Sequence, residues 1–156
     1  MTTDPIIPTW DATWMRIAHI ISHRSKDPNT KVGCVIVDGL NRPVSMGYNG
    51  MVSGVNEDML SWGNDKSLPF YLQKYPYVVH AEANAILYTS RFDLSDCTVY
   101  ATLFPCSDCT KLMMTKKIRS VVYYSDKYNG TEDNVAAKTL MDLCGCHYKQ
   151  ILSDVD

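Results

Sequence analysis

The sequence has no run of about 18 consecutive apolar residues, the length that a membrane-spanning helix requires. Its first residues, MTTDPIIPTW, also lack the basic region followed by an apolar stretch that marks a secretory signal. We therefore expect no membrane partner and a cytoplasmic location, which would be the host cytoplasm if the protein is viral. In a reducing compartment the six cysteines should be free thiols, metal ligands or catalytic groups rather than disulfides.

An excess of basic charge is also missing. The chain has 15 Lys and Arg against 17 Asp and Glu, for a formal net charge of −2. This balance gives no general reason to expect nucleic-acid binding, although it is compatible with a small anionic substrate held by a local basic loop. No repeat, low-complexity segment or linker divides the 156 residues, so we expect a single domain over residues 1–156.

Hydrophobic periodicity and turn residues predict alternating helices and strands. The expected helices cover residues 10–23, 80–90, 106–117 and 131–144. The expected strands cover residues 31–38, 43–48, 97–103, 118–125 and 146–152. Strands that alternate with helices predict a three-layer α/β/α sandwich, and the run over 118–152 is long enough for a parallel crossover.

Residues 49–79 show no clear periodicity and contain several glycines and prolines among aromatic residues. A stretch of this length inside a compact domain is usually functional or mobile.

The segment FPCSDC at residues 104–109 contains two cysteines three positions apart, and His80 precedes them in the segment HAE. Residues i and i+3 share a helix face, so Cys106 and Cys109 can bind one ion. Histidine and cysteine are ligands that zinc prefers, and three protein ligands leave the fourth position open for water. The positive end of a helix dipole would also favour the thiolates.

Glu82 lies two residues after His80 and completes the set. A carboxylate beside a zinc-bound water can take its proton and deliver it elsewhere. The pattern H-x-E…P-C-x-x-C marks zinc-dependent nucleobase deaminases, in which the glutamate is the general acid and base. The sequence therefore favours one catalytic zinc, with Glu82 as the catalytic residue.

The two cysteines of this segment could also have other roles. A lone C-x-x-C pair would suit a redox couple, and a structural zinc would need a fourth ligand. The remaining cysteines and histidines show no paired spacing with the site: Cys34, Cys97, Cys144, Cys146, His19, His23 and His147. The pair at 144 and 146 is interpreted as a helix end and a strand start.

The chain closely resembles the deoxycytidylate (dCMP) deaminase family of the cytidine deaminase-like superfamily. The resemblance covers roughly residues 10–150. It rests on RSKDPNTKVG (24–33), GYNGM (47–51), KYPYVVHAEANAI (74–86), LFPCSDC (103–109) and SDKY (125–128). The zinc motif marks only the superfamily, whereas RSKDPN, GYNG and YPYVVHAE are similar to the dCMP branch found in eukaryotes and some viruses.

This resemblance implies a five-stranded mixed sheet between helices and hydrolysis of dCMP to dUMP and ammonia, on the route to dTMP. It also implies a homo-oligomer, typically a hexamer. dCTP would activate the enzyme and dTTP would inhibit it at a second site, with Mg²⁺ accompanying the triphosphate.

The resemblance also implies roles in substrate binding. The backbone N–H of Ala81 would orient the base, and Val32 with Phe104 would line the apolar pocket around it. Tyr128 would border the nucleotide, or it could be a rim or core tyrosine.

The phosphate of a nucleotide needs cations or N–H donors, which Arg24, Ser25 and Lys26 could supply. The alternative is a solvated charged loop. Asn29 and Asn49 are candidates for the sugar 3′-hydroxyl, because an amide both donates and accepts. Asn49 could instead hold a left-handed turn.

By resemblance, the effector site would include Gly47, Tyr48, Asn49 and Gly50, with parts of 51–79. Some phage relatives carry a second zinc in this region. Here no cysteine lies between positions 34 and 97 and no histidine between 23 and 80, so we predict a single zinc. The order of 51–79 would then depend on packing, a subunit contact or a bound nucleotide.

Three other functions compete with this prediction. A tRNA adenosine deaminase should show a basic surface, and a free (deoxy)cytidine deaminase would not need the Arg24–Lys26 cluster. A zinc-stabilised nucleotide sensor without catalysis would not need Glu82. The sequence leaves open whether dCTP is also a substrate.

Overall fold

The computed structural model describes residues 6–152. Its helices are α1 (Trp10–Ser22), α2 (Ala81–Leu87), α3 (Ser107–Thr115) and α4 (Glu132–Leu143), with short 3₁₀ turns η1 (Glu57–Met59) and η2 (Phe70–Leu72). Its strands are β1 (Gly33–Val37), β2 (Pro43–Tyr48), β3 (Gly50–Met51), β4 (Val78–Val79), β5 (Thr98–Leu103), β6 (Ser120–Ser125) and β7 (His147–Gln150). The elements expected from the sequence are all present. Helix α2 is shorter than expected, and the pair β3–β4 was not predicted.

Five strands form one mixed sheet in the order β2-β1-β5-β6-β7. Strand β1 runs antiparallel to both β2 and β5, whereas the β5–β6 and β6–β7 pairs are parallel. The parallel crossover predicted over 118–152 is therefore confirmed, with α4 as its helix. Because β5 and β6 are parallel, their carboxyl ends meet at one edge of the sheet, where α/β proteins bind ligands.

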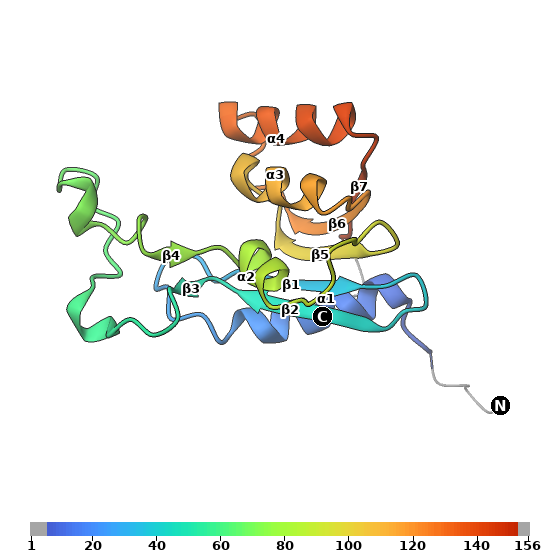
Figure 1. Cartoon of the computed structure of the whole chain (residues 1–156), viewed down its shortest axis with the longest axis horizontal. Helices are drawn as coiled ribbons and strands as arrows, with labels where there is room; N and C mark the ends of the chain where they lie inside the picture. Colours follow the sequence, from blue (N-terminus) through green and yellow to red (C-terminus); the bar gives the residue numbers. More distant parts are fainter. Residues whose placement is uncertain (1–5, 153–156) are drawn as a thin grey trace.

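Strand β1 shows why the protein has three layers. All five of its residues are buried, as its continuous apolar run predicts. Cys34 and Ile36 face a core shared with α2, α3 and α4. Val35 and Val37 face the opposite core, built with Trp14 of α1. Figure 1 shows α1 on one side of the sheet and the other three helices on the other side, which confirms the α/β/α sandwich.

Helix ends follow the capping residues in the sequence. The hydroxyl of Thr9 accepts a hydrogen bond from Ala12 N at 3.1 Å, and that of Thr131 accepts one from Asn134 N at 3.3 Å. These bonds satisfy N–H groups at the starts of α1 and α4 that have no partner within the helix. Gly145 follows α4 with a φ of 67°, a left-handed conformation that glycine adopts without strain.

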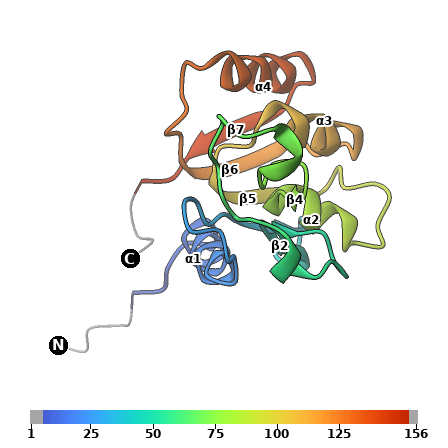
Figure 2. The same cartoon turned by 90° about the vertical axis from the view of Figure 1, so that its left-hand side faces the viewer.

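Residues 52–77 form an irregular segment that contains η1 and η2 and is anchored by the β3–β4 pair. Figure 1 shows that it projects from the sandwich, and Figure 2 shows it in front of the sheet, because that view is turned so that this side faces the viewer. Its exposed large apolar side chains are Val52, Val55, Met59, Leu68, Phe70, Tyr71, Leu72 and Tyr75. The segment therefore has little core of its own, in agreement with its lack of periodicity.

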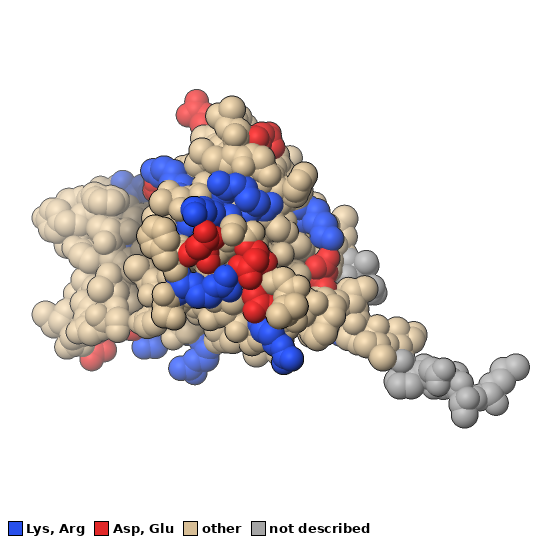
Figure 3. Space-filling model, turned by 45° about the vertical axis from the view of Figure 1, so that its right-hand side comes forward, with Lys and Arg blue, Asp and Glu red and all other residues tan. Residues whose placement is uncertain are grey.

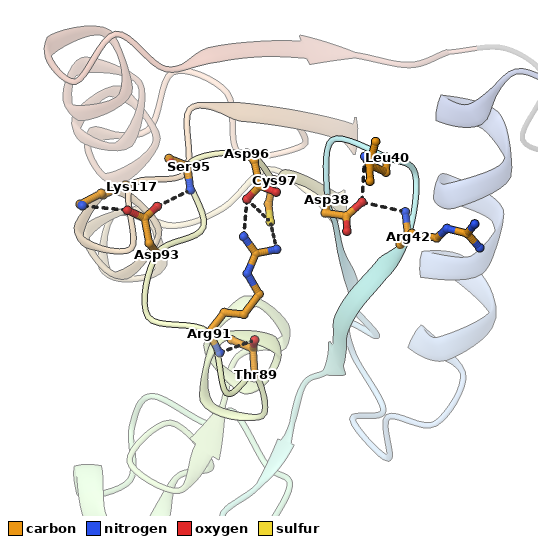
Figure 4. A network of polar contacts seen from close by, with 10 residues as sticks. All are labelled: Asp38, Leu40, Arg42, Thr89, Arg91, Asp93, Ser95, Asp96, Cys97 and Lys117. Atoms are coloured by element: carbon orange, nitrogen blue, oxygen red, sulfur yellow. Dashed lines mark hydrogen bonds and ion pairs between the residues drawn. The ribbon is translucent and has the colours of Figure 1, made fainter.

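Ion pairs fix the connection between α2 and β5 (Figure 4). Arg91 pairs with Asp96 and also donates to the sulfur of Cys97 at 3.6 Å, while Lys117 pairs with Asp93 at 2.8 Å. Arg91, Asp93 and Asp96 precede the first residue of β5, and Lys117 precedes β6. The contacts therefore lie at the edge of the sheet opposite the carboxyl ends of these two parallel strands. Figure 3 shows one face of the molecule, on which basic and acidic side chains are interspersed. Among the described residues, no helix is long and apolar enough to cross a membrane.

Candidate active site

Three potential metal ligands meet at the starts of two helices. His80 is the N-cap of α2, Cys106 is the N-cap of α3, and Cys109 lies in the first turn of α3. Nδ1 of His80 lies 3.3 Å from Sγ of Cys106 and 3.5 Å from Sγ of Cys109. A tetrahedral zinc with bonds of about 2.3 Å to sulfur and about 2.0 Å to nitrogen separates such atoms by about 3.5 Å. The donor set therefore fits zinc in both chemistry and spacing.

Local sequence explains how these ligands converge. Strand β5 ends at Leu103, and Phe104 N donates to Ser125 O of β6 at 2.8 Å, which fixes the chain just before Pro105. The chain then turns into α3, where Cys106 Sγ accepts from Cys109 N at 3.4 Å. Hydrogen bonds from Cys109 and His80 hold the pKa of the Cys106 thiol well below its usual value, despite its partial burial. This favours the thiolate, the form that binds metal.

Glu82 lies in the first turn of α2 and is only 5% exposed. Burial raises the pKa of its carboxyl group above the ordinary value. It lines the same cavity as His80 and Cys106. A buried carboxyl group with a raised pKa beside a metal site is suited to accept and return a proton.

The cavity above these residues has a volume of about 410 Å³, within the range of roughly 300–1,000 Å³ common for small-molecule sites. Six of the residues predicted to contact substrate line it: Asn29, Val32, Asn49, Ala81, Phe104 and Tyr128. They come from the loop after α1, the β2–β3 junction, α2, and the segments after β5 and β6. Parts of the chain that are distant in sequence thus converge on the cavity.

The predicted phosphate residues lie elsewhere. Arg24 and Lys26 line a second, smaller hollow of about 170 Å³, together with Tyr48 and Gly50. Ser25 is only 2% exposed, and its hydroxyl accepts a hydrogen bond from Asp27 N at 3.2 Å. The structure therefore does not bring Arg24, Ser25 and Lys26 together with the zinc ligands.

Asn49 has a different local role from the left-handed turn considered as an alternative. The described residues with positive φ do not include it, so that alternative is wrong. Its side chain accepts from Val32 N at 2.8 Å and donates to Thr30 O at 2.9 Å. The amide still has a second N–H, and it lines the cavity, so a contact with substrate remains a prediction.

Gly47 serves close packing rather than either cavity. A Cβ atom at this position would lie 2.4 Å from Ala81 O and 2.6 Å from Ala85 N. Strand β2 can therefore approach α2 only because position 47 has no side chain.

Comparison with known proteins places the chain in a family. The cytidine and deoxycytidylate deaminase zinc-binding region matches residues 8–125. The human deoxycytidylate deaminase is 38% identical over 143 residues, which span 92% of this chain and 80% of the human protein. A probable deoxycytidylate deaminase of Caenorhabditis elegans is 44% identical over 142 residues, 89% of this chain and 68% of that protein.

The chain belongs to the deoxycytidylate deaminase family of zinc aminohydrolases.

The fold agrees with this membership. The dCMP deaminase of cyanophage S-TIM5, solved in complex with dCMP and dUMP, superposes with a TM-score of 0.72 at 21% identity. The match covers 94% of this chain and 99% of the phage chain. Membership of the deaminase family favours an enzyme over the sensor without catalysis, and favours the dCMP branch over tRNA or free-nucleoside deaminases.

Sequence reasoning missed several polar residues that line the deaminase cavity. They are Asp27, Thr30, Asn64, Lys74, Tyr75, Thr131, Asp133 and Asn134. Asp27 lies within RSKDPN, and Lys74 is the first residue of KYPYVVHAE. These two segments carry the family resemblance, and that resemblance was the only signal in the sequence that could have pointed to the two residues. Their proximity depends on tertiary contacts between segments far apart in the chain.

Proposed function

We propose that this deaminase hydrolyses the 4-amino group of dCMP, giving dUMP and ammonia and so supplying dUMP for dTMP synthesis. The observation that carries the proposal is that buried Glu82 shares one cavity with His80 and Cys106. Cys109 completes the ligand set beside them. The family membership narrows the substrate to a deoxycytidine nucleotide. One zinc per subunit is sufficient for this chemistry.

Zinc held by these ligands lowers the pKa of water, which makes a nucleophile available at neutral pH. Glu82 takes a proton from the attacking water and passes it to N3 of the cytosine. A C4–O bond forms, the C4–N bond breaks, and Glu82 delivers the second proton to the departing amine, which leaves as ammonia. No oxidant or reductant is needed.

The cavity walls orient the base for this attack. Val32 and Phe104 are 9% and 5% exposed and supply apolar surface for the ring. The N–H of Ala81 belongs to the first turn of α2, where N–H groups have no partner within the helix, and it suits the base carbonyl. Asn29 and Asn49 provide amides for the sugar hydroxyl, and Tyr128 borders the nucleotide at the cavity mouth.

The second hollow is proposed as the effector site. It combines the cations Arg24 and Lys26 with Tyr48 and Gly50. A triphosphate carries several negative charges that arginine and lysine can bind, with Mg²⁺ as the counter-ion. Asn49 stands between Tyr48 and Gly50 in the sequence, but it lines the catalytic cavity. An effector bound at Tyr48 and Gly50 could therefore shift the substrate site. In this proposal dCTP activates, dTTP inhibits, and the enzyme is a homo-oligomer, a hexamer by family likeness.

The test is deaminase activity of the zinc-loaded protein on dCMP, deoxycytidine and dCTP in parallel, with and without low dCTP or dTTP. Turnover of dCMP far above deoxycytidine supports the proposed substrate. Equal turnover of both contradicts it and leaves a zinc cytidine deaminase. A change in dCMP turnover on adding the triphosphates supports the effector site, and no change contradicts it.

A further inference from the structure

The catalytic cavity contains a buried ion pair that the reaction above does not use. Lys74 Nζ lies 2.6 Å from Asp27 Oδ2, and the side chains are 10% and 3% exposed. Both residues line the cavity. The pair joins the loop after α1 to the segment that leads into β4 and His80, so it lies where two walls of the site meet.

Charge in the cavity makes Lys74 distinctive. The acidic residues that line the cavity are Asp27, Glu82 and Asp133. Among the described residues that line it, Lys74 is the only lysine or arginine. The phosphate of a nucleoside monophosphate carries about −1.5 to −2 charges at pH 7. A cavity with this acidic lining would repel it unless a cation or N–H donors receive it.

Asp27 is held as a carboxylate by several donors. Its Oδ1 accepts from Asn29 N at 2.8 Å and Thr30 N at 3.2 Å, while Oδ2 accepts from Lys74. Burial alone would raise the pKa of Asp27, but the hydrogen bonds from Lys74 and these two N–H groups outweigh burial and lower it. Asp27 is therefore a carboxylate, and its Oδ2 holds Lys74 Nζ in place.

Lys74 has donors to spare. An ammonium group carries three N–H donors. Within residues 6–152, the Lys74 ammonium group donates a hydrogen bond only to Asp27. The backbone is fixed as well, because Lys74 O accepts from Tyr77 N at 3.0 Å and Val78 N at 3.1 Å. The group is thus preorganised, and a buried pair adds little stability by itself because of the desolvation cost.

We infer that Lys74 binds the 5′-phosphate of the substrate nucleotide, and that Asp27 is the positioning residue that holds Lys74 toward it. The inference deepens the proposed function and rests on it. It moves phosphate recognition from the Arg24–Lys26 loop to the segment just before His80.

A second cation lies close enough to compete for this role. Lys127 Nζ donates to Thr30 Oγ1 at 3.1 Å, and Thr30 lines the cavity. Lys127 is exposed, so water weakens its attraction for a phosphate. The test must therefore distinguish Lys74 from Lys127.

The experiment measures kcat/KM for dCMP and for deoxycytidine with the zinc-loaded full chain. Lys74→Met should lower kcat/KM for dCMP by about 10- to 100-fold, the range for a lost hydrogen bond to a charged group. Its kcat/KM for deoxycytidine should stay within about twofold, because that substrate has no phosphate. The matched control is Lys66→Met, an exposed lysine of the same segment that does not line the cavity.

A second variant guards against misfolding, since Lys74→Met leaves Asp27 buried without its cation. The double variant Asp27→Asn/Lys74→Met removes both charges and should show the same selective loss for dCMP. Asp27→Asn alone should raise KM for dCMP and leave kcat nearly unchanged, whereas a merely structural pair would affect both substrates alike.

The outcomes separate the inference from the proposed function. An equal loss for dCMP and deoxycytidine in the double variant, or an unchanged preference for dCMP, overturns the inference alone. A selective loss in Lys127→Met but not in Lys74→Met also overturns it. A wild-type enzyme without preference for dCMP overturns both.

Discussion

The side-chain oxygen of Asn49 accepts a hydrogen bond from the backbone N–H of Val32 at 2.8 Å. Asn49 lies at the junction of β2 and β3, and Val32 immediately precedes β1. The bond therefore joins the end of an edge strand to the start of its neighbour, at the cavity wall. Together with the bond to Thr30 O, it sets the loop that carries Asn29 and Val32.

Asn49→Ala should weaken both folding and substrate binding. It leaves Val32 N–H and Thr30 O without these partners, which costs about 1–3 kcal/mol for a buried group. We expect a lower urea midpoint and a higher KM for dCMP. Asn49→Asp is the matched variant, because it keeps the acceptor for Val32 and loses the donor to Thr30. Unchanged stability and KM in Asn49→Ala would contradict this role.

Glu82→Gln should separate zinc binding from turnover. The amide keeps the size of the side chain but cannot carry the proton, so we expect kcat to fall by at least about 10²–10⁴-fold. Zinc content, measured by mass spectrometry of the purified protein, should remain one per chain. Turnover near the wild-type level would show that another group moves the proton.

Cys106→Ser and Cys109→Ser should each lose bound zinc and activity. Both sulfurs lie within 3.5 Å of His80 Nδ1, so either substitution removes one of three converging ligands. The control is Cys144→Ser, a partly exposed cysteine outside the site. Full zinc content in the Cys106 or Cys109 variant would refute the ligand assignment.

Gly47→Ala should destabilise the protein by about 1–3 kcal/mol, because an added methyl group in a tightly packed contact forces backbone shifts. The clash is with the backbone of α2, at Ala81 O and Ala85 N. Gly39→Ala is the matched control, since its Cβ would meet only Asp96 O at 3.5 Å. Urea denaturation of both variants tests the difference, and equal midpoints would argue against the close approach.

Arg24→Ala and Lys26→Ala should reduce the response to dCTP and dTTP, with little change in basal dCMP turnover. Both side chains line the second hollow, where Lys26 also pairs with Glu57 at 2.9 Å. The measurement is the dCMP rate as a function of triphosphate concentration. If basal turnover of dCMP falls and that of deoxycytidine does not, these residues bind the substrate phosphate, as first expected from the sequence.

Much of the fold could be read from local patterns. The buried run at 33–37, the N-cap residues Thr9 and Thr131 and the glycine after α4 are short-range features of the sequence, and each lies at the matching place in the structure. The pair β3–β4 was missed because each strand has only two residues, too few to show a period.

The zinc ligand set could be predicted from the sequence itself, because the chemistry needs those residue types at fixed spacing around helix starts. The role of Glu82 as the proton carrier stays a prediction from the same motif. The tertiary structure decided which polar residues share a cavity. Asn49 lines the catalytic cavity, whereas its neighbours Tyr48 and Gly50 line the second hollow together with Arg24 and Lys26. Asp27 pairs with Lys74, which is 47 positions away in the sequence. Such pairings depend on how loops cross the sheet edge, and no local pattern encodes them.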